Sequence, residues 1–278
     1  MKDVAILLAV FNHLDATRTC LESLEKVCAD TGYTHAKYQV VLIDDGSTDG
    51  TSEWVRQHHP TVHLLRGDGN LWWSGGINRG AEYAMETLGA DYLLLWNNDV
   101  QPDPGYFRAL DALIPESGDR VILGSKVLWV GTDETVWSYG GIFDSRTGKK
   151  YLIGYGEKDS SAFSEPREVD WLPGMGTLVP VPVVRQIGVW DEKNFPQYHG
   201  DSDYTFRART AGFPVRVYPQ LRMWNDKSTS GLKHGGTLRG LVRSLTDIRS
   251  NSNVRKNLLF YRRHATSVRA YGAVLHYY

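Results

Sequence analysis

The sequence predicts an α/β fold with a mostly parallel central sheet flanked by helices. Short apolar runs recur along the first half of the chain, stretches with helical spacing separate them, and each run ends in polar or glycine-rich residues. Short, bounded apolar runs are typical of strands buried on both faces, and strands that alternate with helices form parallel sheets. With 278 residues, 41% of them hydrophobic, the chain suits one large globular domain or two small ones.

In the first half, strands are expected at the apolar runs 4–10, 38–43, 62–65 and 92–96. Apolar side chains at helical spacing predict a helix over residues 14–27. Further helices are expected around Trp54 and Val55 and over residues 81–88. Because ligands bind beyond the carboxyl ends of such strands, the residues at those ends should line one cleft. They are Phe11-Asn12, Asp44-Asp45-Gly46, Asn70 and Asn97-Asn98-Asp99.

The pattern changes after residue 123. Alternating polarity and glycine-rich turns predict a hairpin or mixed strands over 136–155, and the polar stretch 156–166 predicts a loop. The apolar run 178–184 leads into a short helix that ends by Gly188. A short helix over 204–211 and a strand over 215–218 follow, and the chain from residue 238 onward is expected to be helical and basic.

The stretch 92–100 carries the first sign of chemistry. Its buried strand stops abruptly at Asn97-Asn98-Asp99. A carboxylate at a strand end, flanked by carboxamides, suits a hard divalent cation shared with phosphate oxygens. The alternative is a plain turn that ends the strand.

Two adjacent aspartates, Asp44 and Asp45, follow the second strand. A carboxylate there accepts hydrogen bonds from a nucleobase N–H or a ribose hydroxyl, as acidic residues at strand ends do in dinucleotide folds. The alternative is an Asx-turn that caps the next helix, which Ser47 or Asp49 would also serve. Capping alone does not require two neighbouring aspartates.

The stretch 41–51, Val-Leu-Ile-Asp-Asp-Gly-Ser-Thr-Asp-Gly-Thr, resembles the nucleotide-binding signature of family 2 glycosyltransferases with the GT-A fold. Other segments resemble further motifs of that family in the right order, so that the likeness spans roughly residues 4–224. They are residues 9–12, 69–80, 97–99, 171–176, 187–192 and 195–207. Within the family, the chain is most similar to bacterial rhamnosyltransferase-like enzymes of surface polysaccharide assembly.

The resemblance implies an inverting, metal-dependent transfer of a sugar from a nucleoside diphosphate donor to a hydroxyl of a glycan or lipid-linked acceptor. A UDP- or dTDP-linked sugar such as dTDP-rhamnose is the expected donor, and Mg²⁺ or Mn²⁺ the expected cofactor. It also implies a GT-A domain over 1–237, with a nucleotide-binding half to about residue 125 and an acceptor-binding half from 126, followed by a basic helical extension over 238–278.

The expected base stands in Tyr198-His199-Gly200-Asp201-Ser202-Asp203, where the family shows Tyr-X-Glu-Asp-X-Asp. This alignment makes Asp201 the catalytic base, which the start of the following helix should keep ionised. His199 is the rival, because its ordinary pKa lies closer to neutral pH. Asp203 and Arg207 match a supporting acidic residue and arginine, and their i, i+4 spacing allows them to pair.

The remaining assignments also follow the resemblance. Metal ligands are Asp99 and Asn225, which replaces the family's histidine; Asp226 or His234 could substitute for it. Aromatic faces pack on sugars, so Trp73 and Trp171 are candidate sugar contacts, with burial in the core as the alternative. The donor-binding candidates are Ala9, Phe11, Asn12, Asp45, Gly46, Asn70, Gly76, Asn78, Arg79 and Asn98. The acceptor candidates are Trp73, Trp171, Gly174, Met175, His199 and Asp203.

Charge is unevenly spread along the chain. The stretch 222–278 holds 11 Lys and Arg against 2 Asp and Glu, within a chain of net charge −1. A basic end on an acidic body suggests an anionic partner, either a membrane surface or a lipid-linked acceptor, whereas a solvated basic helix is the alternative. Leu241, Leu245, Leu258, Leu259, Phe260 and Tyr261 would supply the apolar contacts. No nucleic-acid partner is expected.

The two cysteines, Cys20 and Cys28, suit neither a disulfide framework nor a metal site. With no signal peptide and no apolar stretch long enough to span a bilayer, we expect a cytoplasmic protein, peripheral at most to the inner face of the membrane. Two other functions compete. A nucleotidylyltransferase would need a glycine-rich phosphate loop with Arg and Lys after the first strand, and Phe11-Asn12-His13 is not one. A non-catalytic carbohydrate-binding protein would not need Asp45, Asp99 and Asp201 together.

Overall fold

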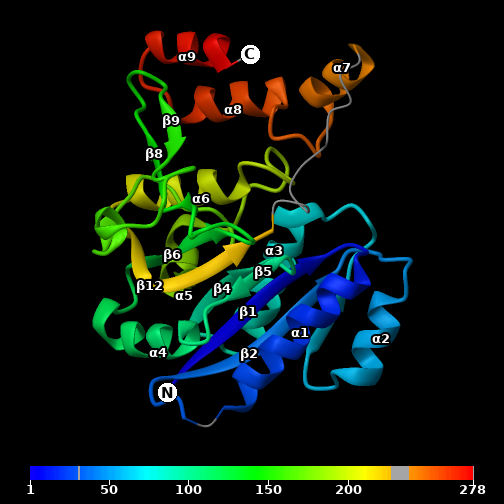
Figure 1. Cartoon of the computed structure of the whole chain (residues 1–278). Helices are drawn as coiled ribbons and strands as arrows, with labels where there is room; N and C mark the ends of the chain where they lie inside the picture. Colours follow the sequence, from blue (N-terminus) through cyan, green and yellow to red (C-terminus); the bar gives the residue numbers. More distant parts are fainter. Residues whose placement is uncertain (31, 227–237, 278) are drawn as a thin grey trace.

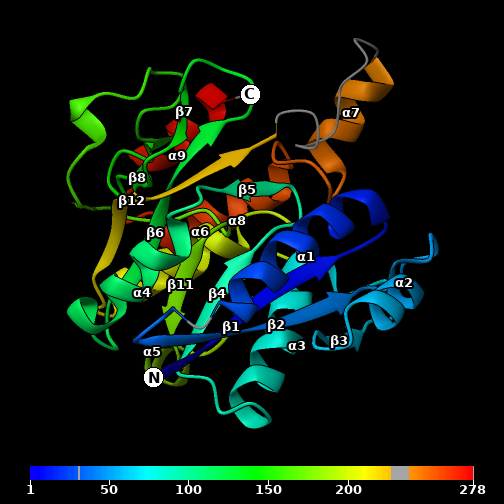
Figure 2. The same ribbon diagram turned by 60° about the horizontal axis from the view of Figure 1, so that its bottom comes forward.

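The computed structural model describes residues 1–30, 32–226 and 238–277, and it has the expected α/β architecture (Figure 1). One large sheet runs in the order β10-β12-β6-β11-β4-β1-β2-β3, with β5 added on β12 and β7 on β6 (Figure 2). Its first half is parallel and comprises β1 (Lys2–Val10), β2 (Ala36–Asp44), β3 (His63–Arg66) and β4 (Tyr92–Trp96). All four strands predicted from the apolar runs are confirmed.

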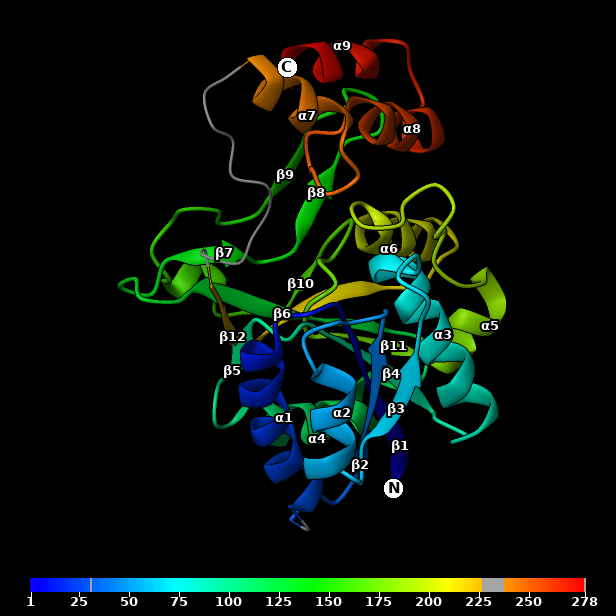
Figure 3. The same cartoon turned by 90° about the vertical axis from the view of Figure 1, so that its right-hand side faces the viewer.

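The two faces of the sheet bury alternate residues of the same strand. Ile6 and Leu8 of β1 pack in one core, and Ala5 and Leu7 pack in the other. The first core is closed by α1 (Leu14–Ala29), α2 (Thr51–His58) and α4 (Tyr106–Ser117). The second is closed by α3 (Trp72–Glu86), α5 (Val181–Ile187) and α6 (Gly200–Thr210). Figure 3 shows α1 and α3 on opposite sides of the strands.

Helix α3 begins nine residues earlier than the predicted 81–88 segment. The first nine residues of α3 contain Gly75, Gly76 and Gly80, which lower helix propensity and make the stretch resemble a loop. Their lack of side chains is what allows the helix to pack closely. A Cβ on Gly76 would lie 2.9 Å from the Cβ of Ala9, and one on Gly80 would lie 2.7 Å from Ile43 Cδ1.

The second half of the sheet is mixed. β6 (Ile122–Trp129) and β12 (Val215–Asn225) are parallel to each other, whereas β11 (Thr177–Pro180) lies antiparallel between β4 and β6. The predicted hairpin is β8 (Gly141–Phe143) with β9 (Lys150–Leu152). The smaller elements are β5 (Val100–Pro102), β7 (Val136–Ser138), β10 (Arg167–Glu168) and the 3₁₀ turn Ser161–Phe163.

The end of the chain is helical, as predicted: α7 (Leu238–Thr246), α8 (Val254–His264) and α9 (Arg269–Tyr277). Helix α8 packs on the body through Phe260 and Tyr261, whose rings lie 5.2 and 5.5 Å from that of Phe143 on β8. Both rings are buried, so these two residues do not form part of an exposed membrane-facing surface, contrary to the prediction. Among the described residues, no helix has the length and apolarity needed to cross a bilayer.

Candidate active site

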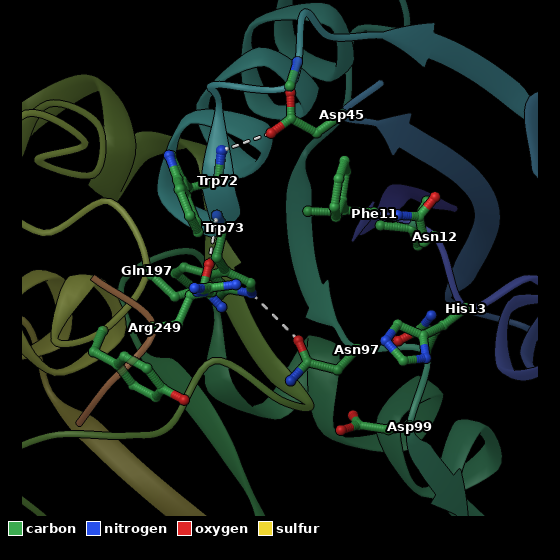
Figure 4. A pocket seen from close by; sticks show the side chains of 15 residues that line it. Phe11, Asn12, His13, Asp45, Trp72, Trp73, Asn97, Asp99, Gln197 and Arg249 are labelled. Atoms are coloured by element: carbon green, nitrogen blue, oxygen red, sulfur yellow. Dashed lines mark hydrogen bonds between the residues drawn. The ribbon is translucent and has the colours of Figure 1, made fainter. Parts of the chain in front are cut away.

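A cavity of about 580 Å³ opens beyond the carboxyl ends of β1, β2 and β4 (Figure 4). Strand ends supply Phe11, Asn12, Asp45 and Asp99, as the sequence predicted, and the start of α3 adds Trp72 and Trp73. The loop before α6 contributes Gln197 and Tyr198, and Arg249 enters from the C-terminal extension. Ala9, Asn97 and Asn98 also line the cavity. The topology of the parallel sheet thus gathers most of the predicted strand-end residues in one place.

The two adjacent aspartates have separate tasks. Asp44 holds the turn after β2, accepting hydrogen bonds from the Ser47 backbone N–H at 2.8 Å and from the Ser52 hydroxyl. Asp45 lines the cavity, and its carboxylate accepts the backbone N–H groups of Gly69 and Trp72, each at 2.9 Å. Asp45 therefore fixes the rim formed by the loop before α3.

Phe11 and Asn12 form the opposite wall. Asn12 ties the end of β1 to the loop after β2, because its side-chain oxygen accepts the Thr48 backbone N–H at 2.9 Å. Phe11 is 55% exposed and its ring faces the cavity (Figure 4). An aromatic face held open to solvent at a cavity wall suits stacking on a flat ligand ring.

At the end of β4, two carboxamide residues, Asn97 and Asn98, precede the carboxylate of Asp99. Asn97 accepts a hydrogen bond from Trp73 Nε1 at 3.3 Å, and Asn98 donates to the Thr17 hydroxyl at 3.0 Å. Asp99 lies between the main cavity and a second one of about 340 Å³ beside α1, which Asp226 also borders.

Asn225 stands next to this group, because it pairs with Val100 across β12 and β5. Its side-chain oxygen is buried and has no hydrogen-bond partner among the described residues. A buried amide oxygen without a donor is costly unless something else satisfies it, and a cation would. Asn225 borders neither cavity. No cluster of three or more His, Cys, Asp or Glu side chains suited to a metal occurs in the described ranges, and His234 lies outside them.

Asp201 lies in the first turn of α6, next to the cavity-lining loop. Its carboxylate accepts the backbone N–H of Gly174 at 2.9 Å and that of Ser202 at 2.7 Å. Burial raises the pKa of Asp201 and outweighs these hydrogen bonds and the charge of Lys150. The sequence analysis predicted that the helix start keeps this carboxylate ionised at neutral pH, and that stays a prediction. Burial also raises the pKa of Tyr198, with further contributions from the charges of Asp201 and Asp99.

Lys150 was not predicted as a site residue. From β9, its ammonium group bonds the Ser202 hydroxyl at 3.0 Å and His199 Nδ1 at 3.1 Å, beside Asp201. It lies 4.0 Å from the ring centre of Phe260. Burial lowers the pKa of Lys150 to about 8, against the charge of Asp201. Nothing in the hairpin sequence distinguishes Lys150 from its exposed neighbour Lys149.

Four predicted acceptor contacts do not line the cavity: Asp203, His199, Trp171 and Met175. Asp203 is fully buried and is bound by Arg263 and His264 of α8, so it is not available to a substrate. Burial, followed by the charge of Lys150, lowers the pKa of His199 well below its ordinary value, which makes it a poor base. Trp171 and Met175 are buried in the cores. Of this group, Trp73 lines the cavity, and Gly174 contacts it: a Cβ on Gly174 would lie 2.3 Å from Trp73 Cζ2.

Several predicted donor contacts also lie outside the lining of the main cavity. The Asn78 side chain holds the loop before α6, donating to the Trp190 carbonyl and to Glu192, both at 2.8 Å. Gly76 packs on Ala9. None of the following residues lines the main cavity: Gly46, Asn70, Gly76, Asn78 and Arg79. Their roles as direct donor contacts stay predictions.

Comparison with known proteins gives one family match: residues 5–161 match the family described as Glycosyl transferase family 2. An N-acetylglucosaminyl-diphospho-decaprenol L-rhamnosyltransferase from Mycobacterium tuberculosis is 28% identical over 216 residues, covering 71% of this chain and 69% of that protein.

Two solved structures share the fold. GalNAc-T7 with UDP, GalNAc and Mn²⁺ has a TM-score of 0.63 at 15% identity, over 88% of this chain but 47% of that one, so this chain spans about half its length. The mannosyltransferase PcManGT from Pyrobaculum calidifontis, with GDP-Man and Mn²⁺, has a TM-score of 0.57 at 14% identity, over 98% of this chain and 68% of that one. These likenesses confirm the predicted GT-A type of fold.

Proposed function

The chain belongs to glycosyl transferase family 2, and from this premise we propose that it moves a sugar from a nucleoside diphosphate to a hydroxyl of a glycan or lipid-linked acceptor. One observation supports the donor class above all. Phe11, Asp45 and Asp99, from three different strand ends, line a single cavity. The name of the mycobacterial relative, a rhamnosyltransferase with a diphospho-lipid acceptor, favours dTDP-rhamnose and a similar acceptor.

We assign the nucleoside to the wall formed by Phe11 and Asp45. The exposed Phe11 ring offers a face for the base, and it lies opposite the loop that Asp45 fixes through Gly69 and Trp72. The second lone pairs of the Asp45 oxygens remain available to a base N–H or a ribose hydroxyl. Trp73, held by Asn97, supplies an apolar face for the donor sugar.

The oxygen donors around Asp99 fit a divalent cation, Mg²⁺ or Mn²⁺. A carboxylate from Asp99, a second from Asp226 and the buried amide oxygen of Asn225 are hard ligands of the type these ions prefer. When bound, the ion stabilises negative charge on the leaving diphosphate. Asn225 would then gain a partner for its side-chain oxygen, which has none among the described residues.

Asp201 is assigned as the general base that takes the proton of the acceptor hydroxyl. Its backbone N–H donors from Gly174 and Ser202 fix the carboxylate, and its raised pKa makes it a better proton acceptor than an ordinary aspartate. Attack by a hydroxyl on the face opposite the diphosphate gives inversion at the anomeric carbon.

Calorimetry with UDP, dTDP and GDP, with and without Mn²⁺, tests this function and identifies the nucleobase of the donor. We expect one nucleoside diphosphate to bind more tightly when Mn²⁺ is present. A hydrolysis screen over the matching nucleotide sugars then identifies the donor. No binding of any of the three would contradict the proposal, and binding with neither hydrolysis nor transfer would favour a non-catalytic protein.

A further inference from the structure

Arg249 enters the donor cavity from a part of the chain that the family match does not cover. It lies in the connection between α7 and α8, yet it lines the cavity together with Asp99 and Gln197. Figure 4 shows it on the same side as Gln197, across from His13. Among the described residues lining this cavity, Arg249 is the one Lys or Arg.

The charges in the cavity call for such a residue. Asp45 and Asp99 are acidic, and a nucleoside diphosphate adds further negative charge. A divalent cation on Asp99 offsets only part of it. Guanidinium groups bind phosphate oxygens through two parallel N–H donors, and these charge-assisted bonds are stronger than neutral ones.

In the structure, the Arg249 guanidinium is paired with Asp247. Its Nη2 and Nε atoms lie 3.0 and 3.1 Å from the two carboxylate oxygens. The Arg249 side chain is 52% accessible and that of Asp247 is 14% accessible, so about half of the arginine is open to water, which screens the pair. Asp247 also binds Arg243 Nε at 3.2 Å and therefore keeps a cationic partner if Arg249 turns away.

We infer that Arg249 is a phosphate-binding residue of the active site, which exchanges Asp247 for substrate phosphate when the cavity fills. This inference rests on the proposed function. Two sources offer the same chemistry: the diphosphate of the donor and the diphosphate of a lipid-linked acceptor. In either case, the C-terminal extension completes the active site instead of only flanking it.

The first test compares R249Q with the matched control R243Q, which removes the other arginine of Asp247 but leaves the cavity lining intact. Affinity is measured for the preferred nucleoside diphosphate with Mn²⁺ and for its nucleoside. For R249Q we expect about tenfold weaker binding of the diphosphate and unchanged binding of the nucleoside. R243Q should match the parent for both ligands. A double variant, R249Q with D247N, should behave like R249Q, which excludes repulsion by the freed Asp247 carboxylate as the cause.

The second test uses two acceptors, a prenyl diphosphate-linked sugar and the same sugar on a phosphate-free alkyl chain. If the phosphate comes from the acceptor, R249Q keeps its nucleotide affinity and raises KM about tenfold for the first acceptor only. Parental values in both tests would overturn the inference while leaving the proposed function intact. Failure of the parent to bind any nucleoside diphosphate would instead contradict the proposed function itself.

Discussion

Asp203 on α6 and Arg263 on α8 form a partly buried ion pair, with Arg263 Nη1 donating to Asp203 Oδ1 at 2.9 Å. The Asp203 side chain is fully buried and is also bound by Arg207 Nε at 3.0 Å and by His264 Nε2 at 2.8 Å. A buried carboxylate tolerates burial only when its oxygens are paired in this way. Asp203 thus connects the C-terminal extension to the helix that carries Asp201.

Replacement D203N should therefore destabilise the protein. It removes the anion that two guanidinium groups and a histidine share, which is the costly way to break a buried pair, and it leaves Arg263 with Asp191 as its acidic partner. We expect a loss of about 3–5 kcal/mol in the free energy of unfolding, measured with urea at neutral pH. E168Q is the control, because Glu168 pairs with Arg216 at the surface and should contribute about 1 kcal/mol or less.

The Asp203 carboxylate also predicts that the free energy of unfolding falls at acid pH. Burial tends to raise the pKa of Asp203, but the hydrogen bond from His264 and the charges of Arg207 and Arg263 outweigh it, so the folded pKa is lowered. A lowered folded pKa contributes stability above the unfolded value, about 3.9, and this contribution is lost as pH falls through the folded pKa. The unfolding free energy of D203N should fall less steeply below pH 4 than that of the parent. Parallel curves would contradict this.

Local pattern predicted the parts of the fold and site that are local in origin. Buried strands are recognisable in the sequence as apolar runs. The positions of Asp45 and Asp99 at strand ends were enough to predict that they line the cavity. The beginning of α3 was missed because Gly75 and Gly76 disfavour helices on their own, and the close approach of Gly76 to Ala9 on β1 arises only in the folded chain.

The sequence could not predict the role of residues whose neighbours come from distant segments of the chain. His199 and Asp203 lie in a motif that suggests substrate contact, yet α8 covers both, and no pattern in residues 195–207 encodes that cover. Likewise, Arg249 is one of many basic residues in the extension, and only the path of the chain brings it to the cavity.

Replacement D99A should abolish the metal-dependent part of nucleotide binding. It removes the carboxylate that borders both cavities, so the charge of the diphosphate loses its compensation. Calorimetry should show equal affinities with and without Mn²⁺ for D99A, and a clear Mn²⁺ dependence for the parent. D103A is a suitable control, because Asp103 follows β5 and borders neither cavity. Parental Mn²⁺ dependence in D99A would refute the assignment.

Replacement K150M should move the acidic limb of the kcat–pH profile to higher pH. The Lys150 ammonium lies beside Asp201 and lowers its pKa, partly offsetting burial. Removing that charge raises the pKa of Asp201. Because a carboxylate base works only when ionised, the pH below which activity is lost should be higher in K150M than in the parent. K149M, which removes an exposed cation stacked on Tyr151, should leave the limb in place. K150R should largely restore the parental profile.

Replacement D201N should lower kcat by about 10²-fold or more, the range for lost acid–base catalysis. The amide keeps the size of the side chain and accepts the Gly174 N–H, but it cannot take a proton at neutral pH. Donor affinity should stay near the parental value, because Asp201 does not line the donor cavity. H199A is the discriminating control: His199 packs on Phe260 and bonds Lys150, so its loss should lower Tm and leave the kcat of the folded enzyme within a few-fold. If D201N turns over at nearly the parental rate while folded H199A binds donor and is inactive, the assignment of Asp201 is wrong and His199 takes its place as the expected base.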